Sequence, residues 1–223
     1  MCQSLWDKLA EDLRFQDQWG DFDRAQSHPN ALKWPEIGDH PVTLVVNGCV
    51  STEHFAEYVP ILVQALDELD ESAQLGMVAS ALCRKGLTEA TSRLLNQYQD
   101  HEQFEDKRFL WSVGNAIYTI APRDHLAECL QICLDDRLGR TRHKLIVHLS
   151  RFKKSEEVFQ TLLSLLNDET VRGAALEALK RLGDVRAIPS IERTPVRAGD
   201  DGIYESHQKM MAMKKLSEKA DNQ

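Results

Sequence analysis

A short apolar block recurs along the middle of the chain, and this repetition constrains the fold more than any other feature of the sequence. The blocks are 78–82, 113–117, 145–149 and 175–179, and each ends at a leucine or isoleucine. Successive ends are spaced by roughly 30–35 residues, a period typical of helical repeat proteins. A second, mostly apolar segment follows each block after a break. Apolar residues at helical spacing that stop and then resume predict helical hairpins in tandem.

Helix-end signals agree with this interpretation. Ser155 is well placed to cap a helix, and two glutamates follow it, where acids suit the positive end of the helix dipole. Asn167 or Asp168 can cap the following helix, and Gly183 can stop that helix in a left-handed conformation. Pro189 stands near the start of the next helix, where a missing N–H costs least.

A single helical hairpin cannot bury both of its apolar faces, whereas stacked hairpins bury them in a continuous core. The sequence therefore predicts an all-α fold, an α-solenoid with helical caps at its N- and C-terminal ends. Because polar caps keep such an array from stacking further, we expect a monomer.

One segment resembles a known family. Val171-Arg172, an alanine-leucine helix, Leu182-Gly183-Asp184 and Arg186-Ala187-Ile188-Pro189 lie within 168–191, which is similar to the short HEAT repeat, also called the phycobilin-lyase HEAT-like repeat. Residues 72–167 match it only degenerately. The resemblance implies a right-handed superhelix of HEAT-like hairpins, in which loop residues such as Asp184 and Arg186 tie neighbouring repeats together. It makes the following residues structural: Arg172, Gly183, Asp184, Arg186 and Pro189.

The chain is predicted to have three parts. Residues 1–70 form an acidic N-terminal cap of helix and loop, 71–193 form the repeat array, and 194–223 form a linker and a capping helix. Outside the array, helices are expected at 3–19, 52–69 and 203–220. The methionines of the last helix are expected to pack on the final repeat, and they are Met210, Met211 and Met213.

Charge is distributed unevenly along the chain. The formal net charge is −8, but residues 1–70 alone carry −9 and the remainder carries +1. Residues 138–154 hold six lysines and arginines and no acid. An overall acidic balance argues against nucleic acid as the partner and favours a basic protein. No apolar run is long enough to cross a membrane, and the sequence begins without a secretory signal, so we expect a cytoplasmic protein.

The residue types that carry chemistry form no catalytic pattern. Cys129 and Cys133 share one face of a helix, but no further ligand completes a zinc site, so we expect both thiols in the core of a reduced protein. The eight histidines are dispersed, His148 is expected at the edge of the core, and no phosphate-binding glycine loop occurs. Trp111 could offer a stacking platform near Asp106, although packing explains its position better. We expect no metal and no cofactor.

These observations favour a non-enzymatic, protein-binding module that uses its concave surface and its acidic N-terminal segment, of the kind found in immunity or inhibitor proteins. Two alternatives stay open. One is an enzyme or lyase subunit, since the resemblance extends to bilin lyases and to related alkyl-base DNA glycosylases, and the other is an assembly scaffold. The second helix of each hairpin and residues 138–154, which we call the basic strip, supply the candidate binding residues. These are Arg93, Gln97, Glu128, Gln131, Glu157, Gln160, Arg140, Arg142 and Lys144.

Overall fold

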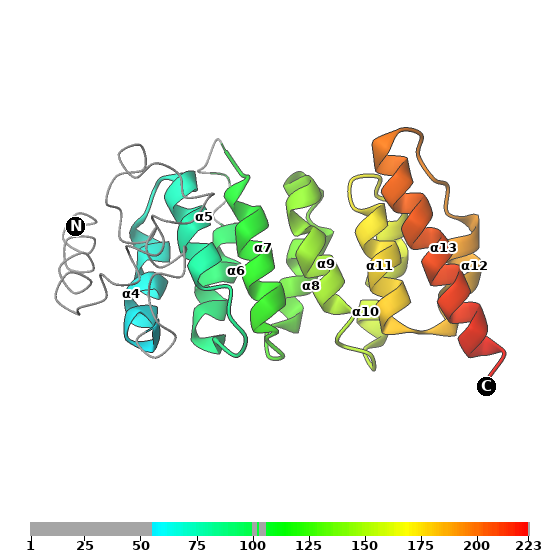
Figure 1. Cartoon of the computed structure of the whole chain (residues 1–223), viewed down its shortest axis with the longest axis horizontal. Helices are drawn as coiled ribbons and strands as arrows, with labels where there is room; N and C mark the ends of the chain where they lie inside the picture. Colours follow the sequence, from blue (N-terminus) through cyan, green and yellow to red (C-terminus); the bar gives the residue numbers. More distant parts are fainter. Residues whose placement is uncertain (1–54, 100–101, 103–105, 223) are drawn as a thin grey trace, which may run out of the picture. The chain divides into compact units, whose positions relative to one another are not determined.

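The computed structural model describes residues 55–99, 102 and 106–222. Within these ranges every regular element is a helix, which confirms the all-α prediction (Figure 1). The chain divides into two compact units, Met1–Ile120 and Ala121–Gln223. None of the described helices is long and apolar enough to cross a membrane. The helix expected at 3–19 and the loop that follows it lie outside the described residues.

The first unit contains the helix expected at 52–69 and the beginning of the array. Its helices are α4 (Phe55–Glu68), α5 (Ser72–Ala81), α6 (Thr91–Gln99) and α7 (Phe109–Ile120). Helix α5 packs against α4 and α7, and α6 packs against the same two helices. Leu75 and Leu94 are fully buried between them. These four helices therefore share one apolar core.

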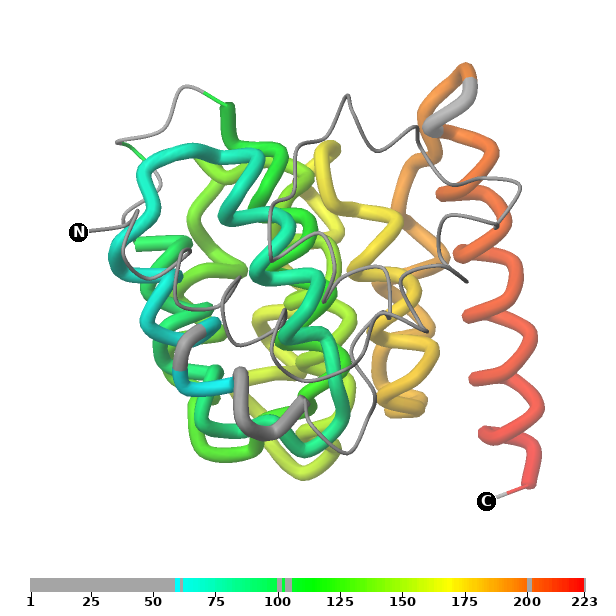
Figure 2. Tube along the Cα trace, turned by 60° about the vertical axis from the view of Figure 1, so that its left-hand side comes forward, coloured from blue at the N-terminus to red at the C-terminus, as the bar shows by residue number. Residues whose placement is uncertain are grey.

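The second unit contains the rest of the array and the terminal helix. Its helices are α8 (Leu126–Leu134), α9 (His143–Leu149), α10 (Glu156–Ser164), α11 (Arg172–Leu182), α12 (Ile188–Arg193) and α13 (Asp200–Ala220). Helix α11 packs against α9, α10 and α13. Figures 1 and 2 show α13 lying along α11 at the outside of this unit.

The structure confirms two of the predicted helix-end signals and contradicts a third. The Ser155 hydroxyl accepts the N–H of Val158 at 3.2 Å, and Gly183 adopts a φ of 76°, both as predicted. The expectation that Asn167 or Asp168 caps α11 was wrong, because α11 begins after Val171 with no side-chain cap. Asp168 instead accepts the N–H of Thr170 at 2.9 Å and closes the turn before the helix.

A buried arginine joins the end of α8 to the loop before α11. Arg142 ends the 3-10 segment Asp136–Arg142 and is 1% exposed. Its Nη1 donates to the Cys133 carbonyl of α8 at 2.8 Å, and its Nη2 forms an ion pair with Asp168, in the loop before α11. One side chain therefore satisfies a carbonyl at the end of one helix and holds the following inter-repeat loop.

The same arrangement occurs one repeat later, at Arg172. Its Nε donates to the Leu166 carbonyl at 2.9 Å, and its Nη1 lies 3.6 Å from Glu205 Oε2 in α13. Glu205 is buried and also pairs with Arg197 Nη2 at 2.7 Å. Both repeats thus place an arginine at the start of their first helix. The guanidinium pairs with a carboxylate of the next element, which is Asp168 before α11 or Glu205 in α13.

The loop of the final hairpin is tied to the hairpin before it. Asp184 accepts the N–H of Arg186 at 3.0 Å, and Arg186 Nη2 lies 2.9 Å from Glu156 Oε2 at the start of α10. The Arg186 guanidinium also lies over the Phe159 ring, 4.4 Å from its centre. This is the kind of tie between repeats that the HEAT resemblance implies.

The expected packing of the terminal methionines was wrong for two of them. Met210 is 60% exposed and Met211 is 38% exposed, whereas Met213 is partly buried. The buried residues of α13 include Gln208, Ala212 and Leu216. Lys180 Nζ also donates to Gln208 Oε1 at 2.7 Å, so α13 docks through residues other than these two methionines.

Candidate functional site

The second helices of the hairpins in the second unit expose one row of side chains each. On α8 the row includes Gln131 and Leu134, and on α10 it includes Glu157, Gln160 and Ser164. Leu134 is 54% exposed, one of several large apolar residues that are exposed in the described part of the chain. Helices α8 and α10 pack against each other, so the two rows are adjacent. We call these five residues the second-helix face.

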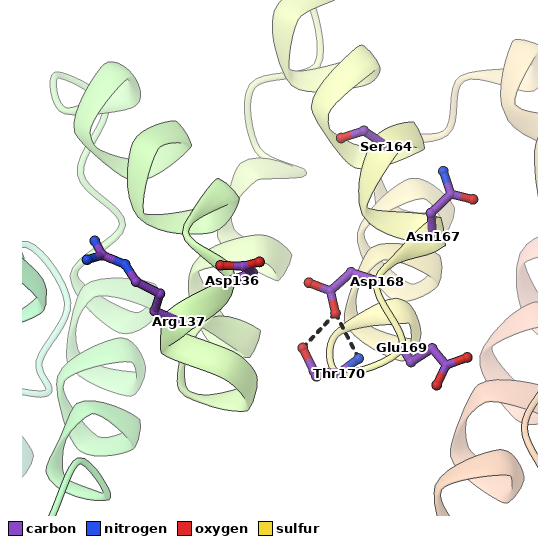
Figure 3. Close-up of a pocket in the computed structure, with 7 residues that line it drawn as sticks. All are labelled: Asp136, Arg137, Ser164, Asn167, Asp168, Glu169 and Thr170. Atoms are coloured by element: carbon purple, nitrogen blue, oxygen red, sulfur yellow. Dashed lines mark hydrogen bonds between the residues drawn. The ribbon is translucent and has the colours of Figure 1, made fainter.

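A polar hollow of about 620 Å³ opens at the end of this face. Residues of the α8–α9 connection form one wall and the α10–α11 connection forms the other (Figure 3). Figure 3 shows Asp136 facing Asp168, with Arg137 pointing away from both. The lining residues are Asp136, Arg137, Ser164, Asn167, Asp168, Glu169 and Thr170. Three carboxylates against one guanidinium make this hollow acidic.

The carboxylates of the hollow differ in their environment. Burial raises the pKa of Asp168, but hydrogen bonds from Thr170 and Arg142 outweigh it, so the pKa of this carboxyl lies below its ordinary value. Asp168 is thus held as an anion by the protein itself. Asp136 and Glu169 are exposed at the rim, where they can meet an external cation, although Glu169 Oε1 also lies 3.8 Å from Arg172 Nη2.

A second polar cluster joins α9, α11 and α13. The Tyr204 hydroxyl donates to Glu177 Oε2 at 2.8 Å, and it lies 3.4 Å from His143 Nε2. Burial lowers the pKa of His143, and burial with the bond to Glu177 raises the pKa of Tyr204. Both shifts favour the neutral forms at neutral pH, which suits a cluster that fastens helices to one another.

The candidates in the first unit have partners within the protein. Arg93 is exposed, and its Nη1 lies 2.8 Å from Asp67 Oδ2 in α4. Gln97 is buried and donates to the Leu66 carbonyl at 2.8 Å. A buried amide with a backbone partner holds two helices together, so we do not include Gln97 in a binding surface.

The candidates in the second unit fall into three settings. Gln131, Glu157 and Gln160 lie on the exposed second-helix face, and Glu128 lies beside it, partly buried and 3.1 Å from His125 Nδ1. In the basic strip Arg140 is exposed and Lys144 is partly buried. Arg142 is interior, as described above, so we leave it out of the proposed surface. The structure therefore groups the second-helix candidates and separates them from Arg142.

The residues considered for chemistry do not line the hollow. Cys129 and Cys133 are fully buried free thiols, as expected, and burial raises the pKa of both. Trp111, which we expected to pack in the core, is 43% exposed on α7. Its neighbour Asp106 is held by Arg108 Nη2 at 2.7 Å. Among the described residues, no cluster of histidine, cysteine, aspartate or glutamate could hold a metal ion.

Comparison with known families identifies one repeat. The family model of the PBS lyase HEAT-like repeat matches residues 171–193, which span α11 and α12. The match confirms the HEAT-like prediction in this segment, and together with the all-helical structure it is consistent with an α-solenoid-like fold. Neither the curated proteins nor the solved structures with which the chain was compared give a match.

Sequence reasoning missed the polar hollow and the role of Arg142. The hollow depends on two loops that lie one repeat apart in the sequence, and no pattern within either loop reveals it. The signal for Arg142 was available, because it precedes Arg172 by one repeat and therefore occupies the same repeat position. Because Arg142 lies among the lysines and arginines of the basic strip, it was interpreted as a surface residue and its correspondence to Arg172 was missed.

Proposed function

We propose that this helical repeat protein binds a partner protein, and that it does so by receiving a basic segment of the partner on the second-helix face and in the polar hollow. HEAT-like repeats typically serve in protein interaction or as scaffolds, which supports the general role. The basic character of the partner is the specific part of the proposal.

The observation that carries the proposal is the charge of the polar hollow. Asp136 and Glu169 stand exposed at its rim, while Arg137, the basic residue among the lining side chains, points away from Asp168 (Figure 3). A volume of about 620 Å³ accommodates an arginine or lysine side chain with its hydration. Because a guanidinium pairs with carboxylates in fixed geometry, an arginine of the partner suits this site best.

Leu134 supplies the apolar contact that a stable interface needs. It is 54% exposed at the end of α8, directly before the loop that carries Asp136. Interfaces combine such an apolar centre with a polar rim, which here consists of Gln131, Glu157 and Gln160. The proposed surface therefore has an apolar centre and an acidic edge.

The proposal includes an immunity or inhibitor role, because a small acidic solenoid suits a basic toxin or nuclease as its target. It also keeps the cytoplasmic location, which the free thiols of Cys129 and Cys133 support. An assembly scaffold is the competing role, and it would bind several partners weakly through different hairpins.

Co-precipitation from the native host tests the proposal, with the full-length protein as bait at low and at high salt. We expect one basic protein that is retained at low ionic strength and released at high ionic strength, since exposed charges are screened. Asp136→Asn with Glu169→Gln should weaken its binding by about tenfold or more, equivalent to about 1.4 kcal/mol. Glu218→Gln, an exposed acid on α13, is the matched control and should have no effect. Absence of any basic partner at low salt would refute the proposal.

A further inference from the structure

Arg137 lines the polar hollow, but its side chain points away from Asp136 and Asp168 (Figure 3). Its guanidinium is bound by Asp135, the residue that follows α8. The Nε of Arg137 donates to Asp135 Oδ1 at 2.9 Å, and the Nη2 donates to Oδ2 at 2.7 Å. The backbone N–H of Arg137 also donates to Oδ1, at 3.1 Å. Because a guanidinium and a carboxylate pair in a fixed geometry, these bonds set the direction of the Arg137 side chain.

Two other aspartates of the chain direct an arginine in the same way. Asp106 accepts the N–H of Arg108 at 2.9 Å and the Nη2 of its guanidinium at 2.7 Å. Asp184 accepts the N–H of Arg186 at 3.0 Å and its Nη2 at 2.6 Å. An aspartate two residues before an arginine therefore fixes the direction of a guanidinium through local bonds. The same local arrangement operates at the wall of the polar hollow.

The direction of Arg137 affects how many carboxylates of the hollow can receive a partner. The Arg137 side chain is 63% exposed, so packing restrains it little, and a change of rotamer can turn it inward without moving the backbone. Asp168 is already paired with Arg142, which leaves Asp136 and Glu169 as the carboxylates at the rim. A guanidinium of the protein inside the hollow would neutralise these carboxylates and occupy the space of a partner's arginine.

We propose that Asp135 is a positioning residue of the polar hollow, which holds the guanidinium of Arg137 outside and so keeps the carboxylates of the hollow open to an arginine of a partner. The inference rests on the proposed function, since it concerns the same site. Asp135 does not touch the partner and acts only through Arg137. Breaking the pair between them releases an internal competitor for the partner's arginine.

The substitution Asp135→Asn separates the direction of Arg137 from the local turn. The asparagine amide keeps an oxygen that can accept the Arg137 N–H, but it lacks the charge and the second acceptor that hold the guanidinium. A second substitution, Arg137→Gln, removes the competing guanidinium while leaving the charge of residue 135 absent. The double variant therefore distinguishes the position of Arg137 from the simple loss of a negative charge beside the hollow.

Fluorescence anisotropy with the full-length protein at low salt tests this inference. The probe is a short labelled peptide of alternating arginine and glycine. We expect Asp135→Asn to weaken its binding by about tenfold, and Asp135→Asn with Arg137→Gln to restore the wild-type affinity. Asp124→Asn, which removes the same charge from an exposed acid in the loop before α8, is the matched control and should bind as wild type does. Equal weakening by the single and the double variant, or wild-type binding by Asp135→Asn, would overturn the inference.

A crystal structure of Asp135→Asn without peptide gives a measurement that does not depend on binding. We expect the Arg137 guanidinium inside the hollow, within hydrogen-bond distance of at least one of its carboxylates. An Arg137 side chain that stays outside the hollow overturns the inference. If the peptide does not bind the wild type, the proposed function is refuted, and this crystal structure alone decides the role of Asp135. Circular dichroism of each variant checks that the helices are intact.

Discussion

Replacing Arg142 with alanine tests whether buried arginines hold the repeats together. The substitution removes the donors to the Cys133 carbonyl at 2.8 Å and the Gly139 carbonyl at 3.0 Å, and it removes the ion-pair partner of Asp168. Loss of one member of a buried pair costs about 3–5 kcal/mol. Because the Asp168 side chain is 23% exposed, water replaces part of the lost interaction. We therefore expect the free energy of unfolding to fall by about 3 kcal/mol.

Urea denaturation followed by circular dichroism measures this loss at pH 7. Arg140→Ala, at a nearby exposed position, is the matched control and should change the free energy of unfolding by less than about 0.5 kcal/mol. The pKa of Asp168 is lowered in the folded state, so its share of the stability exists above its ordinary pKa and disappears as the pH falls through the folded value. The difference between variant and wild type should therefore shrink below about pH 4. If Arg142→Ala unfolds within about 1 kcal/mol of wild type at pH 7, the proposed role of the arginine is wrong.

Three further substitutions probe the core. Burial lowers the pKa of His148 to about 4, so as the pH falls the unfolded chain takes up a proton at this histidine before the folded protein does. The free energy of unfolding of the wild type should therefore fall by about 3 kcal/mol between about pH 6.5 and pH 4. His148→Phe should remove this part of the dependence of stability on pH. Leu149→Ala should cost about 2–5 kcal/mol, because Leu149 is fully buried. Gly173→Ala should cost about 1–3 kcal/mol, since a Cβ there lies 2.4 Å from the Tyr204 ring, whereas Gly76→Ala meets its nearest atom at 3.5 Å and should be tolerated.

Each of these predictions can fail visibly in urea titrations. An unchanged pH slope in His148→Phe would show that the histidine does not govern acid stability. A Leu149→Ala protein that unfolds like wild type would contradict the repeat register. Equal stability of Gly173→Ala and Gly76→Ala would mean that Tyr204 does not pack tightly on α11.

The periodicity predicted the helices of the array well, because apolar residues must face the core at every repeat. The predicted blocks lie within or at the ends of α5, α7, α9 and α11. Local signals were also sufficient at Ser155 and Gly183, since a cap or a positive φ depends on a few neighbouring atoms. They failed at Asp168, whose carboxylate takes part in a turn and an ion pair and does not cap α11.

The candidate site was less predictable, because exposure depends on what packs nearby. Gln97 and Arg142 look like surface residues in the sequence, yet carbonyls from other helices draw both side chains into the interior. Met210 is apolar and was expected to be buried, but α13 docks through other residues, which include Leu216 and Lys209.

The sequence by itself determined that the array described by the structure is helical, that its helices carry recurring apolar blocks, and that residues 168–191 resemble a HEAT repeat, because spacing and local caps are properties of neighbouring residues. Only the tertiary structure decided which charges face solvent and which join the repeats. It brought Asp136 and Asp168 together across a hollow and turned Met210 outward. The physical reason is that burial and ion pairing depend on residues that meet only when hairpins stack.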